Sequence, residues 1–396
     1  MNVLPATGIT PSVTVSGPNG YSHSLSATET IAGLTPGNYT IAATGGSSGR
    51  TTDPIVSAID TLDIIGSPAT VTAGSMASAT VSYVRPGTGN LWIASTGTTM
   101  LAVAQPYSSA QLQAGNVQTA AYTLTFPDVS GGGSGAFDAD GNLWLANANK
   151  NAVEMYTPSQ LVQSANLTAD VTITGSSLNL PVGLAFDALG NLWVANGGGT
   201  TVVEFTVGQI AVSGSPTAAV TLDGFSSPFQ LAFDAAGNLW VPNSFTSTVV
   251  ELTAAQLTAS GTPAVTLSAN ANNSLEAPRG LAFDHTGNLW VANLIASTIV
   301  EYTTGQLAAT GSPVPAVTLS GANTLNATSL AFDNSGNLWA GTAGSAVNEF
   351  TTSQIASSGS PTPAVTILSQ STSVMFDLPP ANLPLAAAGR LRARSK

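Results

Sequence analysis

The sequence predicts an all-β repeat protein, and three observations support this. All six tryptophans lie in one motif, Gly-Asn-Leu-Trp, at spacings of 52, 49, 47, 50 and 49 residues. Five of the copies carry a Phe-Asp pair just before the motif, seven and six residues ahead of the tryptophan. Each unit also holds four short segments rich in apolar and β-branched residues, separated by turn residues. Four strands per unit, repeated six times, is the pattern of a β-propeller. The tryptophans are Trp92, Trp144, Trp193, Trp240, Trp290 and Trp339.

One unit can be followed strand by strand. After the first strand, Asp187 is placed to cap the amides of a turn, and Gly190 to adopt a positive φ. The four strands are expected at 184–187, 192–196, 201–205 and 218–222, with equivalents of the fourth at 263–267, 315–319 and 363–368.

A Thr-x-x-Gln or Ser-x-x-Gln capping box follows the third strand of each unit. A glycine after the box would stop the helix. We therefore expect a helix of about two turns in each unit. The boxes are Ser108/Gln111, Thr157/Gln160, Thr206/Gln209, Thr253/Gln256, Thr303/Gln306 and Thr351/Gln354.

The two ends of the repeat array complement each other. The first copy has Arg85-Pro86 where the others have Phe-Asp, and Phe376-Asp377 near the C-terminus has no tryptophan after it. We expect this C-terminal segment to complete the N-terminal unit, which would remove the exposed sheet edges and give six blades. The segment 381–384 resembles a decayed Gly-Asn-Leu-Trp, so seven blades is the alternative.

The repeat resembles that of the NHL family of β-propellers, whose units read roughly Gly-Leu-Ala-Phe-Asp-x-x-Gly-Asn-Leu-[Tyr/Trp]-Val-Ala-[Asp/Asn]. Residues 181–196 and 278–293 match this pattern closely, and the resemblance covers about residues 85–390. It implies the propeller fold. The basic residue that NHL units often carry after the second strand is missing, so no ligand follows from the resemblance.

Residues 1–84 have a different pattern, with no tryptophan and no capping box. Strands at 13–16 and 21–26 flank an Asn-Gly turn, which indicates a hairpin. Further strands are expected at 39–42 and on either side of Ala73-Gly74. The Leu-x-Pro-Gly-x-Tyr-Thr pattern from Leu34 resembles small immunoglobulin-like or prealbumin-like sandwiches of bacterial surface proteins. We expect a small β-sandwich over 1–84 that acts as a spacer, a propeller over 85–390 and a basic tail over 391–396.

Composition restricts the possible partners. The chain of 396 residues has 8 basic and 20 acidic residues, for a net charge of −12, and four of the basic residues lie in its last seven positions. Such a charge repels phosphate backbones, so we expect no nucleic-acid partner. No apolar run is long enough for a transmembrane helix. The absence of cysteine excludes disulfides and thiol nucleophiles. Few lysines and much Thr, Ser, Ala, Gly and Asn favour an exported bacterial protein, whose export signal would be missing from this sequence.

The repeated acidic and amide residues are expected to serve the blades, because a metal site needs different groups that converge on one point. Asp138-x-Asp140-Gly141-Asn142 faintly resembles a calcium loop but lacks its later glutamate. We expect no metal or cofactor, with Ca²⁺ as the open alternative. The repeated residues are Asp138, Asp187, Asp234, Asp284 and Asp333; Glu154, Glu204, Glu251, Glu301 and Glu349; and Asn147, Asn196, Asn243 and Asn293.

Histidine is scarce, since only His23 and His285 occur. The Trp-rich repeat also resembles that of the virginiamycin lyase family, which implies a catalytic histidine within the propeller. His285 instead lies in a turn where the other copies vary, and we expect it to be an exposed turn residue. The tryptophans are expected to pack between blades, whereas a sugar-binding propeller would expose them.

Functional residues should be those that break the repeat. The candidates for ligand binding are Lys150, Arg279 and His285, although pairing with a carboxylate is the expected use of both basic residues. We predict a non-catalytic binding or scaffold protein of the cell surface or extracellular space, with a protein or carbohydrate partner. The alternative is a divalent-metal-dependent enzyme of the lactonase or lyase type. Further repeat-breaking positions are Phe225, Phe229, Pro242, Phe245 and Leu294.

Overall fold

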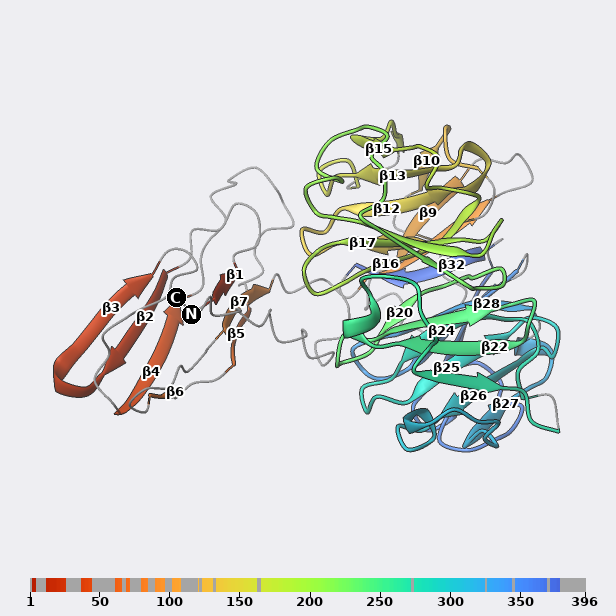
Figure 1. Cartoon of the computed structure of the whole chain (residues 1–396). Coiled ribbons are helices and arrows are strands. Elements are labelled where there is room, and N and C mark those ends of the chain that lie inside the picture. The colour runs from red at the N-terminus through yellow and green to blue at the C-terminus, as the bar shows by residue number, and fades with distance from the viewer. Residues whose placement is uncertain are drawn as a thin grey trace. The chain divides into compact units, whose positions relative to one another are not determined.

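In the computed structural model the chain divides into two compact units, Met1–Gly87 and Thr88–Lys396 (Figure 1). The predicted basic tail, the segment 381–384 and the box Ser108/Gln111 lie outside the described residues. No helix in the described part is long and apolar enough to cross a membrane. The structure describes residues 2–4, 12–25, 37–44, 61–65, 69–71, 80–84, 90–96, 102–107, 120, 123–130, 133–161, 165–271, 274–324, 326–343, 346–368 and 371–377.

The first unit contains a four-stranded sheet in the order β3-β2-β4-β6 and a three-stranded sheet in the order β1-β7-β5. The predicted hairpin is confirmed, since β2 and β3 pair antiparallel through a turn in which Asn19 and Gly20 have φ of 59° and 75°. That the two sheets form a sandwich stays a prediction. The elements are β1 (Asn2–Leu4), β2 (Ser12–Gly17), η1 (Pro18–Gly20), β3 (Tyr21–Leu25), β4 (Gly37–Thr44), β5 (Thr61–Ile65), β6 (Ala69–Val71) and β7 (Thr80–Val84).

The second unit is an all-β propeller with five four-stranded sheets, each antiparallel and in sequence order. We call these five sheets the regular blades. They are β11 (Gly135–Phe137), β12 (Leu143–Asn147), β13 (Ala152–Tyr156) and β15 (Val171–Ile173); β16 (Pro181–Phe186), β17 (Leu192–Asn196), β18 (Thr201–Phe205) and β19 (Val220–Asp223); β20 (Ala232–Phe233), β21 (Leu239–Asn243), β22 (Thr248–Leu252) and β23 (Val265–Ser268); β24 (Pro278–Phe283), β25 (Leu289–Asn293), β26 (Thr298–Tyr302) and β27 (Val317–Leu319); and β28 (Ala327–Phe332), β29 (Leu338–Thr342), β30 (Ala346–Phe350) and β31 (Val365–Leu368).

The Gly-Asn-Leu-Trp copy at Trp92 belongs to a five-stranded sheet, which we call the closing sheet. Its order is β14-β10-β9-β8-β32. The predicted exchange is confirmed, because the C-terminal strand β32 pairs antiparallel with β8, with Phe376 opposite Leu91. The count of five regular blades differs from the six predicted, because the first copy builds this larger sheet. Its strands are β8 (Leu91–Thr96), β9 (Ala102–Tyr107), β10 (Leu124–Phe126), β14 (Ala165–Asn166) and β32 (Ser371–Phe376).

The same aspartate-centred cluster of hydrogen bonds, here called the clasp, fixes the first turn of each regular blade. In one blade, Asp187 Oδ1 accepts from the backbone N–H groups of Leu189 and Asn191, both at 2.9 Å. Its Oδ2 accepts from Asn191 Nδ2 at 2.9 Å and from Trp193 Nε1 at 3.1 Å. Both carboxylate oxygens are thus saturated, and the indole N–H is satisfied within the fold. The clasp recurs at Asp138, Asp234, Asp284 and Asp333.

The clasp of the closing sheet is made between the two ends of the propeller sequence. Asp377 accepts from Asn90 N at 3.1 Å, from Asn90 Nδ2 at 3.0 Å and from Trp92 Nε1 at 3.3 Å. The residue missing from the first copy is therefore supplied by the last strand.

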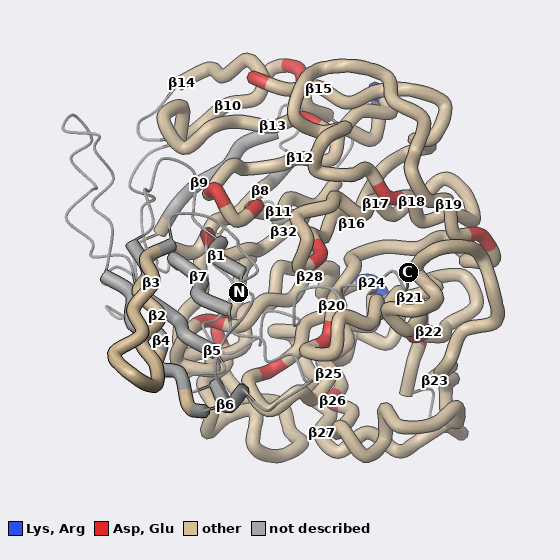
Figure 2. Tube along the Cα trace, turned by 60° about the vertical axis from the view of Figure 1, so that its left-hand side comes forward, with Lys and Arg blue, Asp and Glu red and all other residues tan. Residues whose placement is uncertain are grey.

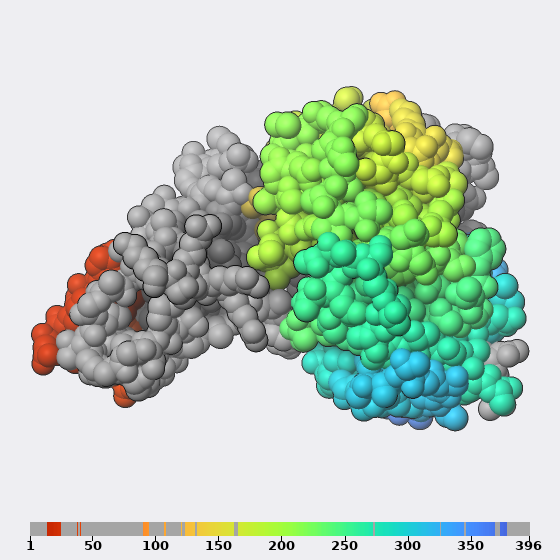
Figure 3. All heavy atoms as spheres, in the orientation of Figure 1, coloured from red at the N-terminus to blue at the C-terminus, as the bar shows by residue number. Residues whose placement is uncertain are grey.

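Each clasped tryptophan is buried and packs on the phenylalanine of the next sheet. The six tryptophans are between 0% and 4% exposed, and the ring centroids of the six pairs lie 5.5–6.4 Å apart. The chain of contacts returns to its start, because Trp339 packs on Phe376 of the closing sheet. Figure 3 shows the atoms of successive blades lying against one another. The pairs are Trp92–Phe137, Trp144–Phe186, Trp193–Phe233, Trp240–Phe283, Trp290–Phe332 and Trp339–Phe376.

Small residues let the first strands of neighbouring sheets approach closely. A side chain at Gly183 would overlap the Phe229 carbonyl oxygen, and Gly280 lies against the Ser329 backbone. Ser329 Oγ accepts from Val374 N at 3.1 Å, which joins β28 to β32. The position is glycine or serine in all but one sheet, as Ser134, Gly183, Gly280, Ser329 and Ser373.

The five capping boxes within the described residues form, but the predicted two-turn helices do not follow them there. Thr206 N donates to Gln209 Oε1 at 2.9 Å, and Gln209 Nε2 donates onward to the Thr217 carbonyl at 2.7 Å. The glutamine thereby ties a single turn to the segment that enters the fourth strand, which leaves no length for a second helical turn. The short 3₁₀ elements of this unit are η2 (Ala148–Lys150), η3 (Ala254–Gln256), η4 (Gln306–Ala308) and η5 (Ala322–Thr324).

Four glutamates lie across the sheet from the clasped tryptophans, in the register Trp193–Glu204, Trp240–Glu251, Trp290–Glu301 and Trp339–Glu349. Burial and the nearby clasp aspartate raise the pKa of each one. The effect is largest at Glu349, where they raise the pKa to about 7. Figure 2 shows that acidic positions outnumber basic ones along the described part of the trace.

This arrangement predicts that stability falls as pH rises. A carboxyl group whose pKa is higher in the folded state than its ordinary value of 4.5 favours folding at low pH, and this contribution is lost as pH rises through about 7. We expect E349Q to be more stable than the parent at pH 8, by about 1–2 kcal/mol, and to flatten the profile between pH 5 and 8. Urea unfolding across this range, with E276Q as the control, measures it. An unchanged profile in E349Q would contradict the assignment.

Candidate functional site

The two ends of the propeller differ in their loops. Pro181 at the start of β16 pairs with Asn196 at the end of β17, and Pro278 pairs likewise with Asn293. The segments that enter the first strands therefore lie beside the turns between second and third strands. We call this end the loop face, and the end that carries the clasps the clasp face.

The repeated asparagines hold the loop face together, as the structural interpretation predicted. Asn196 Oδ1 accepts from Asn179 N at 2.9 Å, and its Nδ2 donates to the Ser177 carbonyl at 2.9 Å. Asn293 makes equivalent bonds to Glu276 N and the Ser274 carbonyl, at 3.2 and 3.1 Å. These amides are thus occupied by the fold itself.

The loop face also has an unusual backbone. In the described part of the propeller, every residue other than glycine with a positive φ lies there, with φ between 48° and 55°. A side chain in this conformation costs roughly 1–2 kcal/mol. In the clasp turns the residue with a positive φ is a glycine, for example Gly190 with a φ of 80°. Strain of this kind concentrates at functional sites. The residues are Asn151, Leu180, Ser227, Ser247, Ala277, Ser297 and Asn326.

Large apolar side chains protrude from the same face. Phe245 is 85% exposed and Ile295 is 64% exposed, and each lies in the turn after a second strand. Leu180 and Leu368 are also exposed at this end. Phe245 was a candidate from the sequence, whereas Ile295 was missed, although the four remaining copies have glycine or asparagine at this position.

The structure brings two of the sequence candidates together. Arg279, the second residue of β24, lies with its guanidinium carbon 4.2 Å from the ring centroid of Phe229. The two residues occupy the same position of adjacent repeats. The side chain is half-buried, and burial lowers the pKa of the guanidinium. The expected carboxylate partner is not found: no acidic group of the described residues lies within ion-pair distance, and the buried Nε has no hydrogen-bond acceptor there.

Gln230 is a residue that sequence reasoning missed. It replaces the glycine or serine found at this position in the other sheets. Its Nε2 donates to the Leu330 carbonyl at 3.0 Å, and its Oε1 accepts from Leu330 N at 3.2 Å and Leu281 N at 3.3 Å. One side chain thus links the first strands of three blades, next to Phe229 and Arg279.

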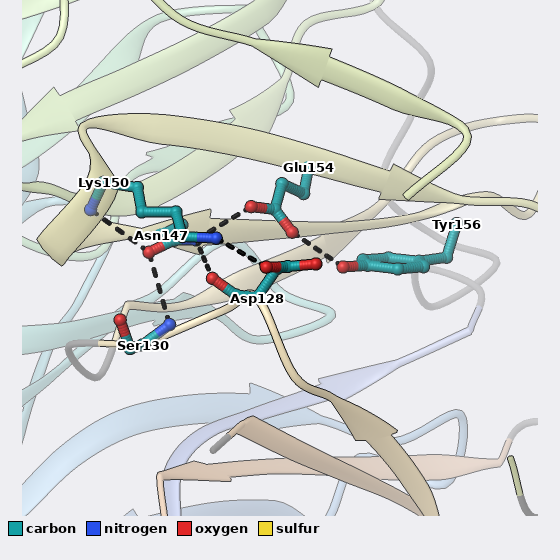
Figure 4. A network of polar contacts seen from close by, with 6 residues as sticks. All are labelled: Asp128, Ser130, Asn147, Lys150, Glu154 and Tyr156. Atoms are coloured by element: carbon teal, nitrogen blue, oxygen red, sulfur yellow. Dashed lines mark hydrogen bonds and ion pairs between the residues drawn. The ribbon is translucent and has the colours of Figure 1, made fainter. Parts of the chain in front are cut away.

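Lys150 lies in a separate network, shown in Figure 4. As expected it pairs with a carboxylate, since its Nζ is 2.7 Å from Asp128 Oδ1. Both side chains are at least half exposed. Such a pair contributes little, about 0–1 kcal/mol.

The buried part of this network surrounds Glu154, which is 3% exposed. Its Oε1 accepts from Asn147 Nδ2, and its Oε2 accepts from the Tyr156 hydroxyl, both at 2.8 Å. Burial and this carboxylate raise the pKa of Tyr156. The predicted equivalence of Glu154 and Glu204 is wrong. An extra residue separates Glu154 from the following threonine, so Glu154 pairs with Leu145 on the other side of the sheet and Met155 lies opposite Trp144.

The remaining candidate residues from the sequence are buried or half-buried within the fold. His285 is half-buried rather than exposed, and it lies in the clasp turn of its blade, between β24 and β25, at the end of the strands opposite the loop-face turns. Its Nε2 is buried without a partner in the described part. Phe225 and Pro242 are buried and Leu294 is half-buried. No group of three or more His, Cys, Asp or Glu among the described residues is placed to hold a metal ion. The buried tryptophans leave no indole face free to stack on a sugar.

No family model and no curated protein matches the sequence. Solved structures match the fold. A protein of unknown function from Bacteroides caccae has a TM-score of 0.50 at 13% identity, over 72% of this chain and 97% of that one. Virginiamycin B lyase from Staphylococcus aureus has 0.45 at 11%, over 68% and 84%. The WD40 β-propeller domain of Doa1 has 0.45 at 12%, over 66% and 76%. At these identities the likeness shows a β-propeller fold.

The Glu154 network yields a stability prediction. Valine occupies this register in three other blades, as Val203, Val250 and Val300. We expect E154V to lower the free energy of unfolding by about 1–3 kcal/mol, because the buried Tyr156 hydroxyl loses its acceptor. Adding Y156F should recover part of the loss, since it removes the orphaned hydroxyl. Urea unfolding of the single and double variants tests this, and E154V as stable as the parent would contradict it.

Proposed function

We propose that this protein is a non-catalytic binding protein whose loop face recognises an extended segment of a partner protein. The observation that carries the proposal is the projection of Phe245 and Ile295 into solvent from neighbouring blades of this face. Exposed aromatic and aliphatic side chains on a rigid scaffold are the anchors of protein interfaces.

Composition supports a protein partner over the other classes considered. A net charge of −12 opposes binding to nucleic acid. The tryptophans that would serve a glycan site are used between the blades.

The finer features of the architecture belong to the same proposal. The closing sheet would be the sixth blade, of the NHL-like type, because its clasp and its Trp–Phe contacts repeat those of the regular blades. The first unit would be a sandwich that spaces the propeller from a bacterial cell surface. The composition of the chain, with few lysines and much Thr, Ser, Ala, Gly and Asn, supports an extracellular setting.

A selection experiment tests the binding proposal. A random peptide library displayed on phage is selected on the immobilised full-length chain, and enriched peptides are measured by fluorescence polarisation. We expect F245S/I295S to weaken peptide binding at least tenfold, because the double variant removes both apolar anchors. The matched control is V207S/V212S, which changes two valines that are 59% and 69% exposed in the turn after β18. Equal binding by both double variants, or no enrichment over the library, would overturn the proposal.

A further inference from the structure

The hydrogen bonding of the Arg279 side chain is incomplete among the described residues. Its Nε is buried and has no acceptor among the described residues. A buried donor left unsatisfied costs about 1–3 kcal/mol, and more when the group is charged. Native folds rarely keep such a donor without a ligand or water to satisfy it. The chain has 20 acidic residues, but none of those described lies within ion-pair distance of Arg279.

The packing around Arg279 defines what can approach it. Phe229 covers one face of the guanidinium, which leaves the edge with its N–H donors as the polar surface. Gln230 already bonds to Leu281 and Leu330, and its backbone N–H donates to the Arg279 carbonyl at 3.2 Å. The planar edge of an arginine fits a carboxylate through two parallel hydrogen bonds.

The segment before Arg279 is fixed to both apolar turns of the loop face. Ala277 N donates to Ser247 Oγ at 3.2 Å, two residues from Phe245 in sequence. The Ala277 carbonyl accepts from Leu294 N at 3.1 Å, next to Ile295. The turns that present Phe245 and Ile295 therefore flank the start of β24. A single anion bordered by apolar groups matches this surface, whereas a polyanion meets the repulsion of a chain with charge −12.

We propose that Arg279, stacked on Phe229 at the entrance of the first strands, binds a single carboxylate of an apolar or aromatic ligand. This inference rests on the proposed function, since the carboxylate would belong to the peptide held by the loop face. An acidic side chain or a C-terminal carboxylate beside an apolar residue has this chemistry.

Small probes test the site directly in the full chain. The Arg279 Nε–H signal is assigned in ¹⁵N spectra as the one lost in R279Q, and it is followed during titration with sodium benzoate. We expect a saturable shift with benzoate and at least tenfold weaker binding of benzamide, which has the same shape without the charge. The control is K150Q, which removes one positive charge, as R279Q does, but from the exposed Lys150–Asp128 ion pair. It should leave benzoate binding unchanged.

Three results would overturn the inference. The first is that the Arg279 Nε–H signal does not shift up to about 100 mM benzoate, a concentration beyond the range of a weak specific site. The second is that benzamide binds as tightly as benzoate. The third is that inorganic phosphate binds at least as tightly as benzoate. The failure of the two proposals can be distinguished. Peptides that need Phe245 and Ile295 but bind R279Q normally would overturn the carboxylate site alone. Benzoate bound at Arg279 without any enriched peptide would overturn the proposed function alone.

Discussion

The structure depends on one interaction, the aspartate clasp that ties the end of each first strand to the tryptophan of the second. Because both carboxylate oxygens are saturated, the clasp fixes the turn and the orientation of the indole together. The indole then presents its ring to the phenylalanine of the next sheet. The contact between sheets thus follows from a bond within a sheet. Asp377, near the C-terminal end of the propeller sequence, makes this bond to Trp92, near its N-terminal end, and the ring of sheets thereby closes.

Because of this constraint, the clasp face and the loop face of the propeller have different roles. The clasp face repeats the same residues, and its left-handed positions are glycines. On the loop face, the asparagines supply the common support, and the residues between them diverge. Positions that repeat serve the fold, whereas Phe229, Gln230, Phe245 and Arg279 break the repeat and converge on neighbouring blades. The functional proposals therefore concern only one face.

Much of this fold could be predicted from the sequence, since the clasp residues are close in the chain and recur with a fixed spacing. Even the exchange of β32 was visible, because Phe376-Asp377 is the piece missing before Trp92. The site was harder to predict, because it joins residues about 50 and 100 positions apart. No local pattern indicates that Gln230 reaches Leu330, or that Arg279 stacks on Phe229 instead of meeting a carboxylate. The register of Glu154 was recoverable, since one extra residue before the following threonine moves it to the other side of the sheet.

The clasp between Asp377 and Trp92 closes the propeller through its C-terminal strand. The most direct test is the free energy of unfolding of D377A beside that of D187A, the same change in a regular blade. We expect both variants to lose about 2–4 kcal/mol, since several hydrogen bonds to a carboxylate are lost together. We also expect faster amide hydrogen exchange in β8 and β32 of D377A only. If D377A unfolds like the parent while D187A is destabilised, the bond between Asp377 and Trp92 does not close the propeller.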